Sequence, residues 1–196
     1  MRGRAAHVGR QFEGVNAFER ALPAMQRLAA IKNEVEMRET QQNIALAAAR
    51  KSILMLGGRA EGGTNFNVAP DFFSFTVDRR INPEENLEEE QRRLHEALEG
   101  FEIETLQEEA AAATPADDPL GVVLSRHVAS VTGKEPAFEM CPGLLETRFY
   151  AAHGIPAYAY GPGLLTVSHG PREFVPIRNI VRCAEIYALT AASILQ

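Results

Sequence analysis

The sequence predicts a protein of mixed α and β structure in two parts, an α+β unit of split βαβ (ferredoxin-like) type in residues 1–110 and a partial α/β unit in residues 115–196. Three observations predict this fold class. A helix-like stretch precedes two strand-like stretches, a capped helix and a further strand-like stretch follow, and beyond the alanine-rich linker at 110–118 apolar stretches alternate with helical ones.

The first unit begins with a long helical segment between Gly14 and Arg50. Its apolar residues recur every three or four positions, as Val15, Phe18, Leu22, Met25, Leu28 and Ile31. Pro23 should kink or restart the helix, because proline lacks a backbone donor and clashes with the preceding turn. Residues 40–50 are either a second helical piece or a loop.

Two strands follow, at 52–59 and 68–80, joined by a glycine-containing turn at 61–65. In the second strand, Phe73, Phe75 and Val77 alternate with polar residues, which is the two-residue period of a strand with one buried face.

Asn82 is predicted to cap the next helix, with Pro83 in the first helical position and two glutamates behind it. Gly100 should end this helix, and residues 101–106 alternate as another strand. The order of these elements is that of a split βαβ sandwich without its first strand.

The second unit is predicted to hold helices at 120–132, 144–152 and 176–195 and strands at 137–140 and 155–160. Alternating strands and helices imply a parallel sheet. Two or three strands are too few to bury both faces of such a sheet, so we expect this unit to belong to something larger.

Composition excludes several classes of partner. The chain has 20 Lys and Arg against 26 Asp and Glu, a formal net charge of −6, so no nucleic-acid partner is expected. No apolar run approaches the roughly 20 residues that span a bilayer, so no membrane association is expected. The start lacks the apolar core of a secretory signal, and with only Cys141 and Cys183 a reducing, cytoplasmic setting fits best.

A few side chains are candidates for chemistry. His7 and His169 lie in expected loops, where functional residues concentrate. Arg79 and Arg80 end a strand whose alternation sends them to opposite faces, and a guanidinium can hold a carboxylate through two parallel bonds. Each of these residues also has a purely structural explanation. The remaining histidines are better explained as surface or helix-end residues: His95, His127 and His153.

Several short motifs occur together in the order and spacing of one family. They are Gly3–Gly9, Glu13–Ala17, Asn67–Pro70 with Arg80 ten residues after the proline, and the stretch Gly154–Val175. With this set the chain resembles the acetylornithine deacetylase, succinyl-diaminopimelate desuccinylase and carboxypeptidase G type of zinc metallohydrolase over nearly its whole length. The joint set is specific, although each motif alone is not.

The resemblance implies a catalytic domain with two zinc ions, interrupted by an inserted lid, or dimerisation, domain of split βαβ type. Residues 1–110 resemble that lid without its first strand, and residues 115–196 resemble the closing part of the catalytic domain. By position, the implied roles are oxyanion stabilisation across the dimer for His7, substrate binding for Asn67 and Arg80, with Arg80 on the carboxylate, and the last zinc ligand for His169.

The resemblance further implies a homodimer formed through the lid and a substrate that is an N-acyl amino acid or small peptide with a free carboxylate. The family's other metal ligands and its general base come from an N-terminal half that has no counterpart here. One histidine cannot hold two zinc ions, so we expect a truncated or split enzyme whose isolated chain is inactive and binds zinc weakly at most. Glu146 stands where relatives often have aspartate.

Two other hypotheses remain. A non-catalytic dimerisation or regulatory module would keep the lid's helix and edge strand without needing His7, Arg80 or His169. A generic ferredoxin-like domain that binds small molecules accounts for residues 1–110 and leaves the motif at 168–175 unexplained.

Overall fold

The computed structural model describes residues 1–44, 47–141, 143–164, 167–168 and 170–195. The chain forms two compact units, the first comprising Met1–Gln42 with Leu46–Ala111 and the second Asn43–Ala45 with Ala112–Gln196. Within the described ranges, none of the helices is both long enough and apolar enough to cross a membrane.

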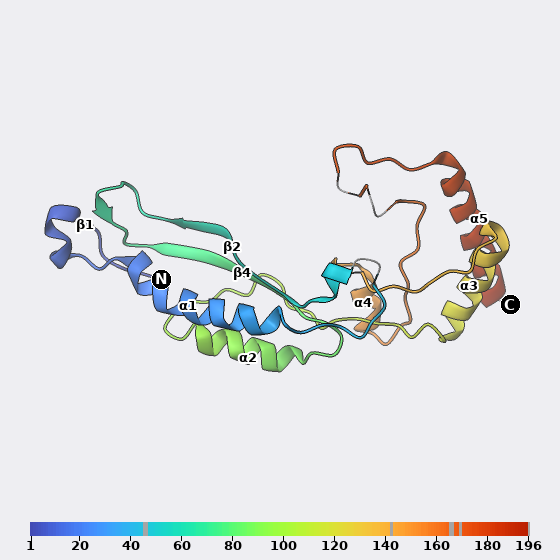
Figure 1. The fold of residues 1–196 in the computed structure, drawn as a ribbon, viewed down its shortest axis with the longest axis horizontal. Coiled ribbons are helices and arrows are strands. Elements are labelled where there is room, and N and C mark those ends of the chain that lie inside the picture. Colours follow the sequence, from blue (N-terminus) through green and yellow to red (C-terminus); the bar gives the residue numbers. More distant parts are fainter. Residues whose placement is uncertain (45–46, 142, 165–166, 169, 196) are drawn as a thin grey trace. The chain divides into compact units, whose positions relative to one another are not determined.

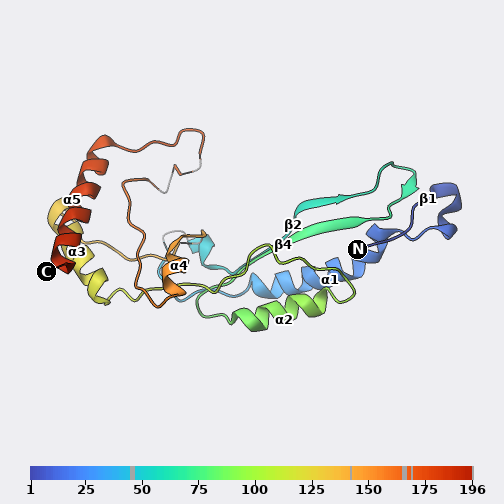
Figure 2. The ribbon, with the colours of Figure 1, turned by 180° about the vertical axis from the view of Figure 1, so that it is seen from behind.

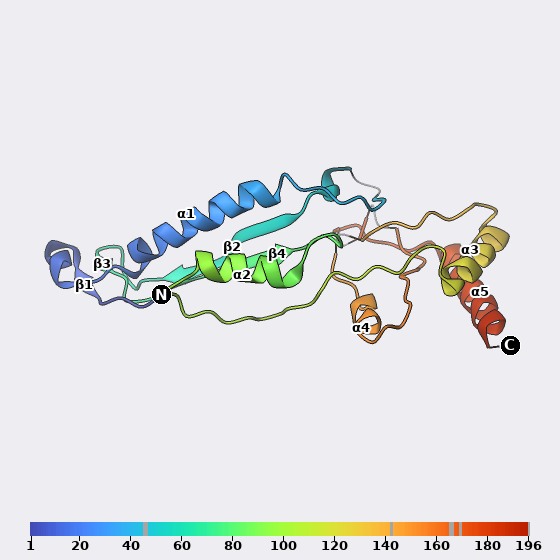
Figure 3. The same ribbon diagram turned by 90° about the horizontal axis from the view of Figure 1, so that it is seen from below.

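The first unit combines two small antiparallel sheets with two long helices (Figure 1). Its elements are β1 (Ala6–His7), the 3-10 helix η1 (Val8–Glu13), α1 (Ala17–Val35), the 3-10 helix η2 (Ala47–Arg50), β2 (Ile53–Gly62), β3 (Val68–Ala69), β4 (Phe73–Arg80) and α2 (Leu87–Ala97). β1 pairs with β3, and β2 pairs with β4. Figures 1 and 3 show α1 and α2 on the same side of the β2–β4 sheet.

Helix α1 begins where predicted but buries a different face. The side chain of Asn16 caps it, accepting hydrogen bonds from the N–H groups of Phe18 and Glu19 at 3.0 and 3.2 Å. Of the six predicted core residues only Leu28 is buried, and its buried neighbours on the helix are Ala17, Ala21, Ala24 and Val35. Alanines let the helix approach the sheet closely, which leaves the large side chains at the margin of the contact. The helix runs through Pro23, so the predicted restart does not occur.

Strands β2 and β4 lie close to the predicted positions, with Ile53 opposite Arg80 and Gly62 opposite Phe73. The register shifts between Leu56 and Ala60, where Gly57 has a φ of +70° that favours glycine. Leu54 is fully buried under α1, and the ring of Phe73 meets that of Phe18 edge to face at 5.1 Å.

The predicted cap of α2 was wrong by four residues. Asn86, not Asn82, caps the helix by accepting a hydrogen bond from the N–H of Glu89 at 2.8 Å. Asn82 is buried instead, and its backbone carbonyl accepts from the N–H of Glu85 in a turn before the helix. Two asparagines four positions apart compete for the cap, and burial of the first decides between them.

Three predicted strands do not form, at 101–106, 137–140 and 155–160. The predicted split βαβ sandwich therefore reduces to two antiparallel pairs, and no parallel sheet occurs in the described part of the second unit. A strand needs a neighbouring strand to pair its N–H and C=O groups. In the described residues these stretches join no sheet and make only scattered contacts, such as the hydrogen bond from the N–H of Met140 to the carbonyl of Asn43.

In its described residues the second unit contains three helices: α3 (Pro119–Thr132), α4 (Thr147–Ala151) and α5 (Ile177–Ile194). Of these, α3 packs on α5 (Figure 2). Gly133 ends α3 with a φ of +72°, as its position predicted. Helix α4 covers only the second part of the predicted helix at 144–152. Large apolar side chains remain exposed on α5, among them Ile177 at 79% and Val181 at 62%.

A buried ion-pair network ties β4 to α2 in the first unit. The guanidinium of Arg79, whose side chain is only 5% exposed, donates to Glu90 at 2.9 Å and to Glu85 at 2.5 Å. Arg38 joins from the end of α1, with contacts of 2.6 and 2.7 Å to the same two carboxylates. Ser52, at the start of β2, also donates to Glu85. The network thus fixes four segments of the chain to one another.

This network makes the stability of the protein pH-dependent. Burial alone would raise the pKa of Glu85, but hydrogen bonds from Ser52, the Asn82 N–H and the two arginines outweigh it and hold the pKa at about 2, against an ordinary 4.5. A depressed pKa stabilises the fold fully above about pH 4.5 and progressively less as the pH falls toward about 2, by roughly 3 kcal/mol in all.

Urea unfolding as a function of pH checks this. Glu85→Gln should remove that part of the acid sensitivity and destabilise the protein at neutral pH by roughly 3 kcal/mol, because two arginines lose a partner. Glu96→Gln is the matched control, since the Arg92–Glu96 pair is about 60% exposed and should contribute under roughly 1 kcal/mol. Equal pH profiles for wild type and Glu85→Gln would contradict the assignment.

Candidate functional site

The structure brings two of the predicted site residues together. β1 and β3 pair so that His7 lies opposite Val68, which places the neighbouring Asn67 beside the imidazole. The side-chain nitrogen of Asn67 lies 3.2 Å from Nε2 of His7, and the carbonyl of Asn67 accepts from the N–H of Val8 at 2.8 Å. Both the backbone and the side chains therefore hold this pair.

The hydrogen bonds of His7 define which ring nitrogen carries the proton. Nδ1 accepts from the backbone N–H of Gly9 at 3.1 Å. A neutral imidazole has a single N–H, so the proton lies on Nε2. Nε2–H can donate to the oxygen of the Asn67 amide once that amide rotates by a half-turn, since the two ends of an amide have the same shape. His7 therefore directs its Nε2–H toward the Asn67 amide at the exposed end of its ring, and this donor becomes available to another acceptor when that amide turns aside.

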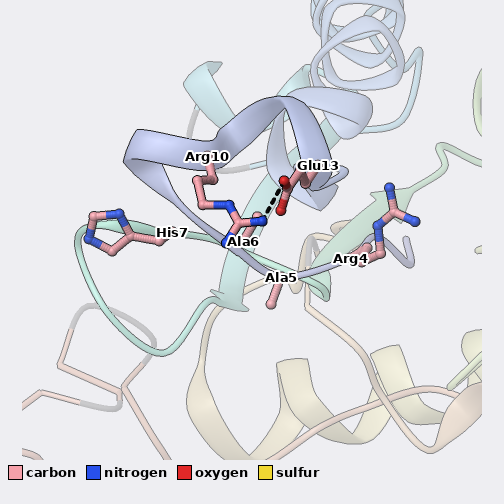
Figure 4. A pocket seen from close by; sticks show the side chains of 6 residues that line it. All are labelled: Arg4, Ala5, Ala6, His7, Arg10 and Glu13. Atoms are coloured by element: carbon pink, nitrogen blue, oxygen red, sulfur yellow. Dashed lines mark hydrogen bonds and ion pairs between the residues drawn. The ribbon is translucent and has the colours of Figure 1, made fainter.

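An open hollow of about 580 Å³ adjoins this pair, lined by residues of β1 and η1 (Figure 4). Arg10 and Glu13 form an ion pair of 2.6 Å there, while Figure 4 shows the His7 ring at the edge, pointing away from them. The ring is exposed at the surface of the unit, where it contacts the side chain of Asn67.

Gly9 is a functional neighbour that the sequence interpretation missed. A Cβ on Gly9 would lie 3.4 Å from Nδ1 of His7, tighter than ordinary contacts, so the absence of a side chain lets the backbone N–H approach the ring. The signal was present as a glycine two positions after the histidine, inside the quoted motif.

Arg79 and Arg80 have opposite environments, as the strand alternation predicted. Arg79 is buried in the ion-pair network, whereas the side chain of Arg80 is 48% exposed. Arg80 contacts only the carboxylate of Asp78, at 3.2 Å, among its side-chain ion pairs in the described part of the chain. Its guanidinium is thus the accessible one of the two.

His7 and Arg80 lie in different two-stranded sheets, β1–β3 and β2–β4. Arg80 ends β4, while β1 and β3 precede the start of β4 at Phe73. Seven residue steps at about 3.3 Å give roughly 23 Å along the strand between those ends, whereas a dipeptide-sized molecule spans roughly 7 Å. One chain therefore cannot place both side chains on the same small substrate.

A metal centre was predicted at His169, which lies outside the described residues. Across the ranges that the structure does describe, no group of three or more His, Cys, Asp and Glu side chains could hold a metal ion. A catalytic zinc requires three protein ligands and an open position. The donor set of the described residues therefore does not fit a zinc ion by itself.

We expect the isolated chain to retain zinc weakly at most. Equilibrium dialysis at neutral pH measures this directly, with His169→Ala as the variant and His95→Ala as a matched control on α2. All three proteins should retain the same small amount. Two tightly held ions that disappear on His169→Ala would contradict the expectation.

Comparison with known proteins covers both units. A family model described as the peptidase dimerisation domain matches residues 1–105. Succinyl-diaminopimelate desuccinylase of Nitrosomonas eutropha is 31% identical over 140 residues, covering 68% of this chain and 36% of that protein. Acetylornithine deacetylase of Myxococcus xanthus is 25% identical over 205 residues, covering 98% of this chain and 50% of that protein.

The fold is also similar to that of a solved structure. Aminopeptidase PepT from Bacillus cereus matches 100% of this chain and 50% of its own with a TM-score of 0.68, at 20% identity. The chain therefore spans about half the length of the proteins that it matches end to end.

Proposed function

The chain belongs to the M20 peptidase family, whose dimerisation domain matches residues 1–105, and from this premise we propose that it is the lid and the C-terminal catalytic part of a zinc-dependent amide hydrolase. Its substrates are N-acyl amino acids or small peptides with a free carboxylate. The zinc ligands other than His169 come from a polypeptide segment outside this sequence.

The observation that carries this proposal is the His7–Asn67 pair. The Nε2–H donor is oriented by a backbone hydrogen bond to Nδ1 and is held by Asn67 until a substrate carbonyl replaces that amide, so it suits a carbonyl on which negative charge develops. Arg80, exposed and only loosely paired, suits the substrate's carboxylate. The exposure and contacts of these side chains support the roles that the motifs imply.

The separation of His7 and Arg80 supports a composite site in a homodimer. Because one chain cannot bring both to one small substrate, Arg80 serves the site of its own chain and His7 serves that of the partner. The lid of each chain thereby completes the other chain's site.

We place the dimer contact at the free edge of β2. Residues 53–58 of this strand carry no charge, and Ile53 and Met55 are 37% and 47% exposed. In proteins that stay monomeric, edge strands usually carry charges or prolines. Strand β4 fits this pattern, with Asp78, Arg79 and Arg80 at its end, but residues 53–58 of β2 do not. An uncharged edge of this kind favours pairing with a second copy.

Met55→Lys should weaken the dimer by about tenfold or more, because a charge on the paired edge loses its hydration. Met37→Lys is the matched control, since Met37 is 79% exposed and lies after α1 rather than on the strand. Light scattering over a dilution series measures both. Unchanged association for Met55→Lys would exclude this edge as the interface.

The proposal itself is tested by supplying the absent half. We define the completed enzyme as this chain with the unmatched half of the Myxococcus xanthus relative joined ahead of Met1. Loaded with zinc, it should hydrolyse N-acyl amino acids, and neither half alone should do so. A folded, zinc-loaded completed enzyme without activity would instead favour the non-catalytic dimerisation module.

A further inference from the structure

Phe66 is an aromatic side chain held out into solvent beside the candidate site. It is 99% exposed, although burying a phenylalanine is strongly favourable. The turn that carries it is fixed on its C-terminal side, where the N–H of Val68 donates to the carbonyl of Asn65 and the carbonyl of Asn67 binds Val8. The exposure of Phe66 is thus imposed by an ordered backbone.

A second hollow of about 330 Å³ opens at Phe66 and shares no lining residue with the hollow beside the Arg10–Glu13 pair. Its apolar walls are Phe18, Val68, Pro70 and Phe73, from α1, β3 and β4. Gly62 and Gly63 also line it. A Cβ on Gly62 would come within 2.5 Å of the carbonyl of Phe72, so the backbone there accepts no side chain without moving.

The chemistry of the lining selects its ligand. Its polar side chains are the neutral amides of Asn16 and Asn65, and no lysine, arginine or histidine lines it. A second carboxylate, such as that of a succinyl group, would find no cation here to compensate its lost hydration. An aromatic or branched aliphatic group would instead gain contact with three phenylalanine rings.

We infer that this hollow receives an apolar acyl group or side chain of the substrate whose carbonyl meets His7. The inference rests on the proposed hydrolase function. Its basis is continuity: Asn67 contacts His7, while Phe66 and Val68, the residues on either side of Asn67, line the hollow. One three-residue segment, 66–68, therefore contributes both to the contact with His7 and to the hollow. The substrates that fit are N-aroyl or branched N-acyl amino acids and peptides with apolar side chains.

Binding to the full chain tests this without zinc or turnover. The probes are N-benzoylglycine and N-succinylglycine, which share the amino acid and differ in the acyl group. In amide-resolved NMR titrations, N-benzoylglycine should shift the signals of Gly62, Gly63 and Asn65 with a Kd on the order of 1–10 mM. N-succinylglycine should cause no saturable shift over the same range.

Substitutions of Phe66 supply the controls. Phe66→Ala should weaken N-benzoylglycine binding by about fivefold or more, while Phe66→Leu should retain most of it, because leucine remains apolar. Phe12→Ala is the matched control, as Phe12 is 80% exposed but does not line the hollow. The inference is overturned if Phe66→Ala binds N-benzoylglycine as well as the wild type does, or if the two probes bind equally. It is also overturned if the NMR signals shift with protein concentration and not with probe concentration.

The two proposals fail in different ways. An active completed enzyme together with no binding of N-benzoylglycine would refute the apolar site alone. An inactive completed enzyme whose hollow still binds N-benzoylglycine through Phe66 would refute the hydrolase function and, with it, the assignment of the ligand as a substrate.

Discussion

Arg80→Ala in the completed enzyme should lower kcat/KM by on the order of a hundredfold or more, because a charged pair with the substrate's carboxylate is worth a few kcal/mol. The structure adds a reason for the size of this effect. Arg80 is 48% exposed, and its ion pair with Asp78 lies at the surface, so its guanidinium is available to a ligand without breaking a buried contact.

The control for this substitution is Arg59→Ala. Arg59 lies on the partner strand β2, is 74% exposed and pairs with Glu61 at 2.8 Å, so it has the same chemistry without the proposed role. Its loss should change kcat/KM less than about twofold, as expected for a solvated surface pair. Arg80→Lys should recover part of the activity, because it keeps the charge but not the planar fork.

Arg79→Ala separates substrate binding from folding. Its guanidinium is buried against Glu85 and Glu90, so removing it should destabilise the protein by roughly 3–5 kcal/mol and reduce the folded fraction. Measured per folded molecule, kcat/KM should fall much less than in Arg80→Ala. Equal losses per folded molecule in the two variants would contradict the assignment of Arg80.

The sequence could predict elements whose causes are local. Periodicity and flanking residues located α1, α3 and α5, and an apolar run ending in glycines located β2. Alternation located β4 and sent Arg79 and Arg80 to opposite sides. Helices satisfy their own backbone hydrogen bonds, so a local pattern is sufficient for them. Antiparallel strands joined by a short turn, such as β2 and β4, also make their backbone hydrogen bonds within a short stretch of sequence.

Other features depended on parts of the chain that are distant in sequence. The apolar stretch at 155–160 reads as a strand, but in the described part of the chain it joins no sheet, and the backbone of Ala157 pairs with the side chain of Thr114 instead. The buried face of α1 is set by how closely the sheet can approach, which favoured Ala21 and Ala24 over Phe18. The contact between His7 and Asn67 joins residues 60 positions apart, and only the β1–β3 pairing creates it.

His7→Ala in the completed enzyme should lower kcat by about 100- to 1,000-fold with little change in zinc content, because a donor aimed at a developing oxyanion contributes roughly 3 to 4 kcal/mol. The hydrogen bond from Gly9 to Nδ1 predicts that the donor is Nε2–H. Because this donor acts on charge that develops only in the transition state, KM should change little. His95→Ala, an exposed histidine on α2, should leave kcat unchanged.

Mixing experiments then decide which chain's substrate His7 serves. When His7→Ala and His169→Ala proteins exchange subunits freely, about half of the dimers are mixed, and each has one site with both groups intact. Activity should therefore return to about a quarter of wild type if His7 acts across the dimer. If His7 acts within its own chain, no mixed dimer has an intact site and no activity returns.

The reverse mixture gives an independent measure of the same geometry. Wild-type chains exchanged with an equal amount of the double variant His7→Ala/His169→Ala form mixed dimers in which each site lacks one group if His7 acts across the dimer. Only the purely wild-type dimers then work, and activity should be about a quarter of an all-wild-type sample of the same total concentration. If His7 serves its own chain, every wild-type chain keeps its site and about half of the activity remains. The separation of roughly 23 Å between the ends of β4 predicts the lower value, because it prevents His7 and Arg80 of one chain from meeting the same substrate.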